Sequence, residues 1–227
     1  MPDTLQRLLG FAVSVVTLPI LAALALLSWL DSPGPILHRA SRVGRGGRPF
    51  TCFKLRTMNV DPGSGPAVTA AGDPRVTRVG RFLRRYRLDE LPQLWNVARG
   101  EMRLVGPRPE APLFVDLRDP LHRRVFTDVP GITGLTQLAY VDEAAMLAVP
   151  DPETHYQSVV LPTKLLLDVA YLERRTARLD LWILWRTAAA MVGRSLDIGT
   201  AEARLGLRPG SLSLPAVRSP GPARRPG

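Results

Sequence analysis

The chain has almost no cysteine, and this scarcity excludes two kinds of site. Cys52 is the only cysteine among 227 residues, so the chain cannot form an intrachain disulfide or a zinc site built from cysteine and histidine. It has only three histidines, which lie far apart in the sequence and form no metal-binding motif. With no disulfide to maintain, a reducing, cytosolic setting is the default for the soluble part of the chain.

Lysine is also scarce, because Lys54 and Lys164 are the only two among 30 basic residues. The formal net charge is nevertheless +10, which indicates a polyanionic neighbour such as nucleic acid, an anionic membrane surface or a phosphate-rich substrate. Arginine binds phosphate bidentately, although a compositional bias toward arginine would give the same count. Aromatic stacking signatures and recognised nucleic-acid-binding motifs are missing, so we expect no nucleic acid as partner.

One long hydrophobic run, residues 8–30, is long enough to cross a bilayer. A signal peptide fits poorly, because only Arg7 precedes the run and no small-residue cleavage site follows it. Pro19 lies near the middle and predicts a kink, so a spanning helix and a bent helix that enters and leaves on one side both remain open. The flank after the run carries four arginines: Arg39, Arg42, Arg45 and Arg48. By the positive-inside rule this flank is cytoplasmic.

The remainder predicts an α+β fold that is mainly helical. Residues 36–58 read as strand, glycine turn and strand, in which Lys54 and Arg56 are expected to point the same way. A Gly- and Pro-rich loop at 61–72 precedes a basic amphipathic helix that can lie on an anionic membrane surface. We therefore expect a membrane-inserted helix over 1–34, a cytoplasmic and interfacial catalytic domain over 35–193, and a disordered Pro/Arg-rich tail over 194–227.

Two further stretches of the sequence predict helices. Residues 91–102 predict a short helix that ends near Gly100. Residues 178–192 are apolar with few charges, and they fit an interfacial helix or a core helix equally well.

The stretch RLDELPQLW, residues 87–95, places two carboxylates, Asp89 and Glu90, side by side after a run of arginines. If Asp89 caps a helix, Pro92 is tolerated in the first turn, and the helix N-terminus attracts anions. Adjacent helical side chains diverge by about 100°, so one carboxylate can attack phosphorus while the other holds Mg²⁺. A solvated helix start is the plainer interpretation of the same residues.

A second candidate lies in LVGPRPE, residues 104–110, where two prolines bracket Arg108. Each proline fixes its own φ and restricts the residue before it. An arginine held in this way loses less entropy when it binds an anion. An ordinary proline turn with an exposed arginine is the alternative.

The motifs FKLRTM, VTRVGRFLRRYRLDELPQLWNVARGEM, LVGPRP, PGITGLTQL and DLWIL follow the apolar leader in this order. The series covers roughly residues 5–190 and resembles the bacterial sugar transferases, in particular the monotopic phosphoglycosyl transferases in their minimal single-domain form. The resemblance implies transfer of a phospho-sugar from a UDP-sugar to undecaprenyl (polyprenyl) phosphate, with release of UMP. This reaction would start exopolysaccharide, capsule or O-antigen assembly on the cytoplasmic face of the inner membrane, with membrane lipid and downstream glycosyltransferases as further partners.

The resemblance also assigns roles to individual residues. Asp89 matches the nucleophile that forms a phosphoaspartyl intermediate, and Glu90 matches the residue that binds Mg²⁺. Arg84 and Arg108 match arginines that contact phosphate or nucleotide. The remaining matches are substrate-binding candidates and the break in the membrane helix: Lys54, Arg56, Asp168 and Pro19.

Three positions depart from the family pattern. Leu18 stands where a serine usually precedes the helix-breaking proline, Arg103 where a serine precedes LVGPRP, and Val129 where a basic residue precedes PGITG. They leave the carboxylate pair intact but weaken the expectation of a re-entrant helix and of acceptor contacts. A non-catalytic membrane scaffold and a membrane-tethered nucleic-acid-binding module are the rival functions.

Overall fold

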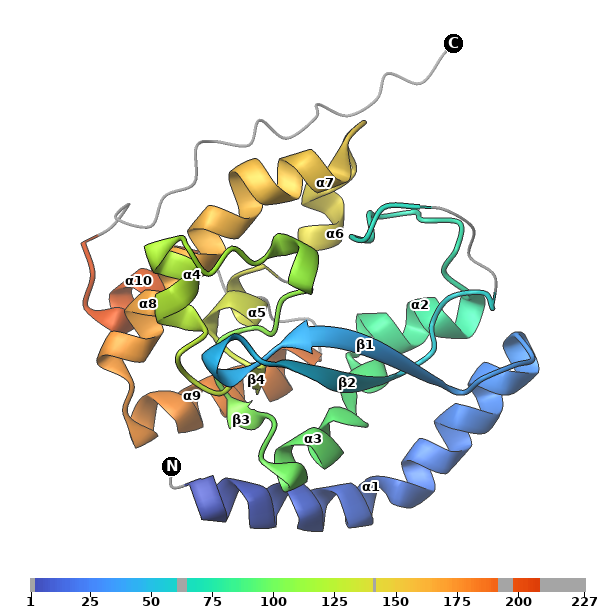
Figure 1. Ribbon diagram of the computed structural model, residues 1–227. Coiled ribbons are helices and arrows are strands. Elements are labelled where there is room, and N and C mark those ends of the chain that lie inside the picture. Colours follow the sequence, from blue (N-terminus) through green and yellow to red (C-terminus); the bar gives the residue numbers. More distant parts are fainter. Residues whose placement is uncertain (1–2, 61–64, 141, 192–197, 209–227) are drawn as a thin grey trace.

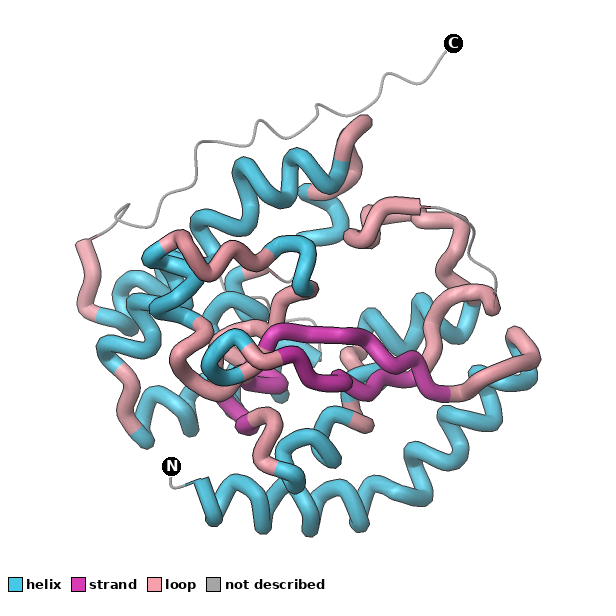
Figure 2. Tube along the Cα trace, in the orientation of Figure 1, coloured by secondary structure: helices cyan, strands magenta, loops and turns pink. Residues whose placement is uncertain are grey.

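The computed structural model describes residues 3–60, 65–140, 142–191 and 198–208. It confirms a mainly helical protein with small strands, as Figure 2 shows. The N-terminal half contains α1 (Asp3–Asp31), β1 (Leu37–Val43), a 3₁₀ turn η1 (Arg45–Gly47), β2 (Pro49–Leu55), α2 (Arg78–Arg85), a 3₁₀ turn η2 (Leu88–Glu90) and α3 (Gln93–Arg99).

The C-terminal half alternates short elements with two longer helices. It contains β3 (Arg103–Val105), η3 (Pro112–Phe114), α4 (Pro120–Val125), β4 (Gly131–Thr133), α5 (Leu135–Ala139), α6 (Glu143–Met146), α7 (Pro152–His155), a π-helical turn η4 (Tyr156–Val160), α8 (Leu161–Arg174), α9 (Ala177–Met191) and α10 (Ile198–Leu205).

The apolar run forms a single helix, α1, which includes Pro19 and bends near its middle along one side of the molecule (Figure 1). Gly10 allows α1 to approach α3 closely, because a Cβ there would lie 2.7 Å from Val97 Cγ1. On its outer face α1 exposes large apolar side chains, among them Leu8, Phe11, Val16, Leu18 and Ile20. By length and composition the helix could cross a membrane.

The predicted strand–turn–strand is confirmed as the antiparallel hairpin β1–β2. Gly46 and Gly47 adopt positive φ in its turn, a conformation that glycine accepts without strain. The register pairs His38 with Lys54 and Arg42 with Phe50. Because cross-strand partners and alternate residues share a face, His38, Arg42 and Lys54 lie on one side of the hairpin.

The hairpin, α1 and α2 share one small core made of Leu24, Leu55 and Leu83. Gly80 of α2 lies against the loop that follows β2, where an added Cβ would meet the Thr57 carbonyl oxygen at 2.1 Å. The helix therefore starts close to the end of β2, with Thr77 as its N-cap. This contact fixes the direction from which α2 leads into the carboxylate pair.

The C-terminal helices surround a second core beside the short parallel pair β3–β4. Ile183 of α9 is buried in this core, whereas Trp185 on the same helix is 61% exposed. The expectation of a disordered tail from residue 194 is wrong over Ile198–Leu205, because α10 forms there and buries Ala201 and Leu205 against α5, α8 and α9. The proline-rich stretch from 209 onward lies outside the described residues.

Candidate active site

The two adjacent carboxylates lie in η2, the 3₁₀ turn between α2 and α3. The expectation that Asp89 caps a helix is wrong, because α3 begins only at Gln93, with Pro92 as its N-cap. Arg87, which precedes the turn, has φ 53° and is the one non-glycine residue with positive φ in the described chain. A side chain at positive φ is strained, and here that conformation redirects the backbone from α2 into the turn.

Asp89 is buried, with 8% of its surface exposed. Burial and the neighbouring Glu90 carboxylate raise its pKa, while Lys54 and Arg84 act in the opposite direction. This carboxylate is therefore poorly solvated and depends on nearby cations for its charge.

Glu90 has the opposite electrostatic environment. Its Oε1 lies 3.3 Å from Lys54 Nζ. Burial disfavours its ionisation, but Lys54, Arg108 and Arg87 together outweigh burial and lower its pKa. Of the two carboxylates, Glu90 is thus the one held as a stable anion.

Two arginines next to the carboxylate pair are fixed by hydrogen bonds from their side chains. Arg84 Nε donates to Thr57 Oγ1 at 2.8 Å, and burial lowers the pKa of Arg84 despite the attraction of Asp89. Arg87 Nη2 donates to the Gln137 carbonyl oxygen at 2.7 Å. These bonds leave other N–H groups of both guanidinium groups available for an anion.

Arg108 differs from these two because its guanidinium makes no hydrogen bond to any residue that the structure describes. Burial disfavours its charge, but Glu143, Glu90 and Glu110 outweigh burial and raise its pKa. Arg108 is therefore a permanent cation with unused donors, beside the carboxylate pair. This placement agrees with the predicted anion-binding role of LVGPRP.

A buried ion cluster lies behind Arg108 and was not predicted. Lys164 is only 2% exposed, and its Nζ lies 2.9 Å from Glu143 Oε2 and 3.0 Å from the Tyr156 hydroxyl. Glu110 Oε1 is 3.7 Å from the same ammonium. The sequence held one signal for this cluster, because Lys164 is one of only two lysines in an arginine-rich chain.

A cavity of about 10 Å³ next to the carboxylate pair adds two residues that sequence reasoning missed. Arg42 and Gln137 line it together with Lys54, Glu90 and Arg108. The hairpin pattern could have indicated Arg42, which shares a face with Lys54. Gln137 lies within the motif PGITGLTQL, although the sequence assigned it no role; its Oε1 is buried and has no hydrogen-bond partner within the described structure.

Three of the predicted substrate-binding residues do not line this cavity: Arg84, whose contacts are given above, Arg56 and Asp168. Arg56 is buried and donates to the Pro35, Met58 and Ser32 carbonyl oxygens and to Ser32 Oγ, so it points away from Lys54. The expectation that Lys54 and Arg56 point the same way is therefore wrong; the reason is that β2 ends at Leu55.

Asp168 lies beneath the LVGPRP loop. It accepts hydrogen bonds from the Thr136 hydroxyl and from the Arg108 backbone N–H. Burial raises the pKa of Asp168 to about 7, although both bonds favour its charged form. The contacts connect Asp168 to the backbone of Arg108.

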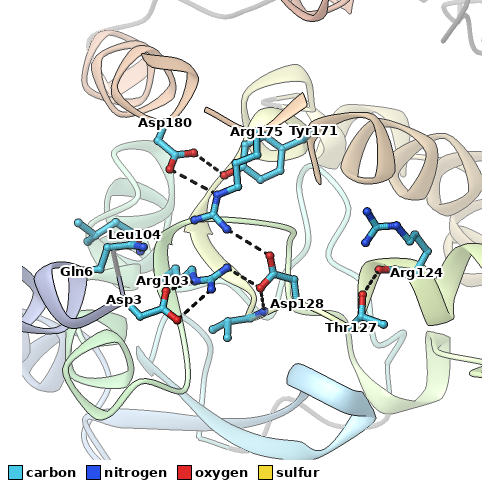
Figure 3. A network of polar contacts seen from close by, with 11 residues as sticks. Asp3, Gln6, Arg103, Leu104, Arg124, Thr127, Asp128, Tyr171, Arg175 and Asp180 are labelled. Carbon is cyan, nitrogen blue, oxygen red and sulfur yellow. Dashed lines mark hydrogen bonds and ion pairs between the residues drawn. The ribbon is translucent and has the colours of Figure 1, made fainter. Parts of the chain in front are cut away.

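The unusual Arg103 forms part of an ion-pair network rather than of the carboxylate site (Figure 3). Its guanidinium contacts Asp3 Oδ1 at 2.9 Å and Asp128 Oδ1 at 2.5 Å. Asp128 in turn pairs with Arg175 at 3.2 Å. Val129, the other departure in this region, is buried.

The chain is similar in sequence to several curated proteins. A Caulobacter vibrioides UDP-glucose:undecaprenyl-phosphate glucose-1-phosphate transferase is 51% identical over 53% of this chain and 46% of its own length. A protein of the same name from Xanthomonas campestris is 36% identical over 78% of this chain and 35% of its own. A Bacillus subtilis relative is provisionally named an undecaprenyl-phosphate N-acetylgalactosaminyl 1-phosphate transferase. It is 45% identical over 58% of this chain and 68% of its own length.

The chain thus spans less than half the length of two of these three relatives. The family model described as bacterial sugar transferase matches residues 2–194, which include the membrane helix, the hairpin, the carboxylate pair and the LVGPRP loop. The chain belongs to the bacterial sugar transferase family.

Proposed function

We propose that this protein transfers a phospho-sugar from a UDP-sugar to undecaprenyl phosphate through a phosphoaspartyl intermediate on Asp89. The observation that carries the proposal is a buried carboxylate with a second carboxylate, Lys54 and Arg84 beside it, and with Arg108 beside the second carboxylate. A carboxylate is a competent nucleophile toward phosphorus, and cations are needed to let it approach a phosphate.

In the first half-reaction an Asp89 carboxylate oxygen attacks the phosphorus that bears the sugar. A bond forms between this oxygen and phosphorus, and the bond from phosphorus to the bridging oxygen breaks. UMP leaves with the electron pair of that bond. Lys54, Arg84 and Arg108 stabilise the phosphate oxygens, whose charge is distributed around phosphorus in the transition state.

In the second half-reaction a phosphate oxygen of undecaprenyl phosphate attacks the same phosphorus. The bond between Asp89 and phosphorus breaks and returns the free carboxylate, while the product is a sugar diphospholipid. The two steps are both displacements at one phosphorus, so the same cations serve both. No external oxidant or proton donor is required for the balance.

We propose Mg²⁺ as the cofactor, held by Glu90 with Asp89 nearby. Mg²⁺ commonly binds one or two carboxylates together with substrate phosphates and water. This preference fits the site, because Glu90 is held ionised. The described residues include no group of three or more acidic, His or Cys side chains that could hold a metal, so a metal here would need ligands from substrate and water. When bound, the ion would neutralise donor phosphate charge.

We also propose that α1 is re-entrant, so that both of its ends face the cytoplasm. At its N-terminal end, Asp3 pairs with Arg103, and the Gln6 side chain accepts from the Leu104 N–H at 3.1 Å (Figure 3). At the other end, Ser28 Oγ donates to the Arg56 carbonyl oxygen at 2.7 Å. Contacts of both helix ends with one domain support a helix that enters and leaves the membrane on the same side.

The bend of α1 near Pro19 supports this topology despite Leu18 in place of the usual serine. A hydroxyl still lies just before the proline, because Thr17 Oγ1 donates to the Val13 carbonyl oxygen at 2.8 Å. Such back-bonding hydroxyls are known to bend helices. The catalytic domain would then lie on the cytoplasmic face of the inner membrane.

The test is UMP release from a panel of UDP-sugars, with undecaprenyl phosphate and Mg²⁺, by the full chain in detergent. The proposal predicts UMP from at least one UDP-sugar and none from the Asp89→Asn variant. Absence of UMP from every sugar in a folded protein would favour a non-catalytic scaffold. DNA retention that falls with salt, without UMP release, would favour the nucleic-acid-binding alternative.

A further inference from the structure

We infer that the apolar chain of the polyprenyl phosphate acceptor lies in a groove along the start of β1. This inference rests on the proposed function. The groove, called here the acceptor groove, has a volume of about 590 Å³. It is lined by Pro35, Ile36, Leu37, His38, Arg39, Arg56 and Val60.

The outer end of the acceptor groove is apolar and adjoins the end of the membrane helix. Ile36, Leu37 and Val60 are 38%, 42% and 54% exposed. Pro35 follows α1 by four residues, and its carbonyl oxygen accepts from Arg56 Nε at 2.5 Å. Three large apolar side chains exposed together call for an apolar partner, and here they adjoin the segment that directly follows α1.

The wall of the groove is held in place independently of any ligand. The guanidinium of Arg56 is fully engaged with Ser32, Pro35 and Met58. Its contacts join the end of α1 to the loop after β2. Arg56 thus acts as a positioning residue for the groove, which gives a structural role to a residue that points away from the carboxylate pair.

One residue of the acceptor groove, His38, is the neighbour of an active-site cation. His38 lines the groove and is the cross-strand partner of Lys54, so the two side chains start about 5 Å apart. Lys54 Nζ lies 3.3 Å from Glu90 Oε1. Burial, then Lys54, Arg42 and Arg84, lower the pKa of His38, which agrees with its closeness to these cations.

A ligand that fits both ends must be apolar along its length and anionic at its head. A polyprenyl phosphate has this form, with its phosphate placed at Lys54 and its first isoprene units beside Leu37 and Ile36. The donor does not fit the outer end, because a UDP-sugar is polar throughout. The groove therefore provides a route by which the acceptor phosphate reaches Asp89 while its chain remains at the membrane.

The test uses Ile36→Gln and Val60→Gln, with Leu113→Gln as the matched control. Leu113 is 56% exposed and belongs to η3, outside the groove. Two rates are measured in detergent: the burst of UMP on mixing with the UDP-sugar alone, and transfer as a function of undecaprenyl phosphate concentration. The first half-reaction needs no acceptor, so it reports fold and donor binding separately.

We expect an unchanged UMP burst and an acceptor KM raised at least about fivefold in each groove variant, because each loses apolar contact with the chain. The Leu113 control should match the wild type in both measurements. An unchanged acceptor KM would overturn the inference, and so would loss of the UMP burst together with transfer. Equal loss of binding to vesicles that lack undecaprenyl phosphate would assign the surface to bulk lipid instead. A wild type that gives no burst would refute the proposed function itself.

Discussion

At the scale of single residues, the active site separates two carboxylates that are neighbours in the sequence. Asp89 has a raised pKa because it is buried beside Glu90, whereas cations lower the pKa of Glu90. The group with the raised pKa is the proposed nucleophile, and it must be ionised to attack. Activity should therefore fall as the pH decreases through the pKa of Asp89.

Lys54 links the two carboxylates, and its removal tests this view. Lys54 lowers the pKa of both groups, so Lys54→Met should raise both and move the acid limb of the kcat/KM profile to higher pH. The measurement is UMP release between about pH 5 and 9 for the two proteins. A uniform loss of rate with an unmoved acid limb would show that Lys54 acts only through substrate binding.

Asp168 gives a second pH-dependent prediction, for stability. Its folded-state pKa of about 7 lies above the usual value of 3.8, so the folded state binds this proton more tightly. The contribution of Asp168 to the free energy of unfolding is therefore largest at low pH. It declines as the pH rises toward 7, by at most about 1.4 kcal/mol per pH unit. Asp168→Asn should accordingly be less costly at pH 7 than at pH 5.

Thermal unfolding of the wild type and the Asp168→Asn variant in detergent at the two pH values measures this difference. Parallel changes of the two midpoints with pH would contradict a raised pKa for Asp168. The variant also reports on Arg108, because Asp168 accepts a hydrogen bond from the backbone N–H of Arg108. A weaker affinity for the UDP-sugar in a folded Asp168→Asn protein would connect the carboxylate to the LVGPRP loop.

The sequence singled out the carboxylate pair, Lys54, Arg84 and Arg108 from local motifs, and the structure brings these residues together. It did not single out Arg42, Gln137 or Lys164, because their positions beside the pair depend on which elements pack together. Arg42 reaches the cavity through the hairpin register, and Gln137 reaches it from α5, the helix that follows β4. It also predicted that Arg56 points the same way as Lys54. That prediction is wrong because alternate side chains share a face only within a strand, and β2 ends at Leu55.

At the scale of elements, the proposed membrane topology depends on α1. The sequence predicted its length and its proline, but the contacts of its two ends with β3 and with the loop after β2 are tertiary and could not be predicted. Thr4→Cys tests the resulting topology, because Thr4 is exposed at the start of the helix. The native Cys52 is buried and should not react.

In inverted and right-side-out vesicles, a membrane-impermeant thiol reagent should label the Thr4→Cys protein only from the cytoplasmic side. Arg118→Cys is the control, because Arg118 is exposed in the catalytic domain. The two cysteines should react in the same vesicles. Labelling of residue 4 from the opposite side to residue 118 would establish a spanning helix.

At the scale of the whole molecule, the C-terminal segment contributes to the catalytic domain. Ala201 and Leu205 of α10 pack with Tyr171 and Ile183 in the core beside β3. The composition of residues 194–227 suggested disorder, because proline, glycine and arginine dominate the segment as a whole. The short apolar helix within it gains stability only from the core that it covers.

Two truncations test this contribution. A chain that ends at residue 192 loses α10 and should unfold at least about 5 °C below the full chain, since a buried leucine alone contributes about 2–5 kcal/mol. A chain that ends at residue 208 keeps α10 and should unfold with the full chain. Equal midpoints for all three chains would show that α10 adds nothing to the domain.

The central claim is that Asp89 carries the phospho-sugar between donor and acceptor. Its most direct test is mass spectrometry of the full chain, quenched after mixing with the UDP-sugar and Mg²⁺ in the absence of undecaprenyl phosphate. We predict one added sugar-phosphate mass on the peptide that contains Asp89, which disappears on addition of the acceptor. Continued formation of the sugar diphospholipid, with no adduct on Asp89 at any time, would contradict the mechanism.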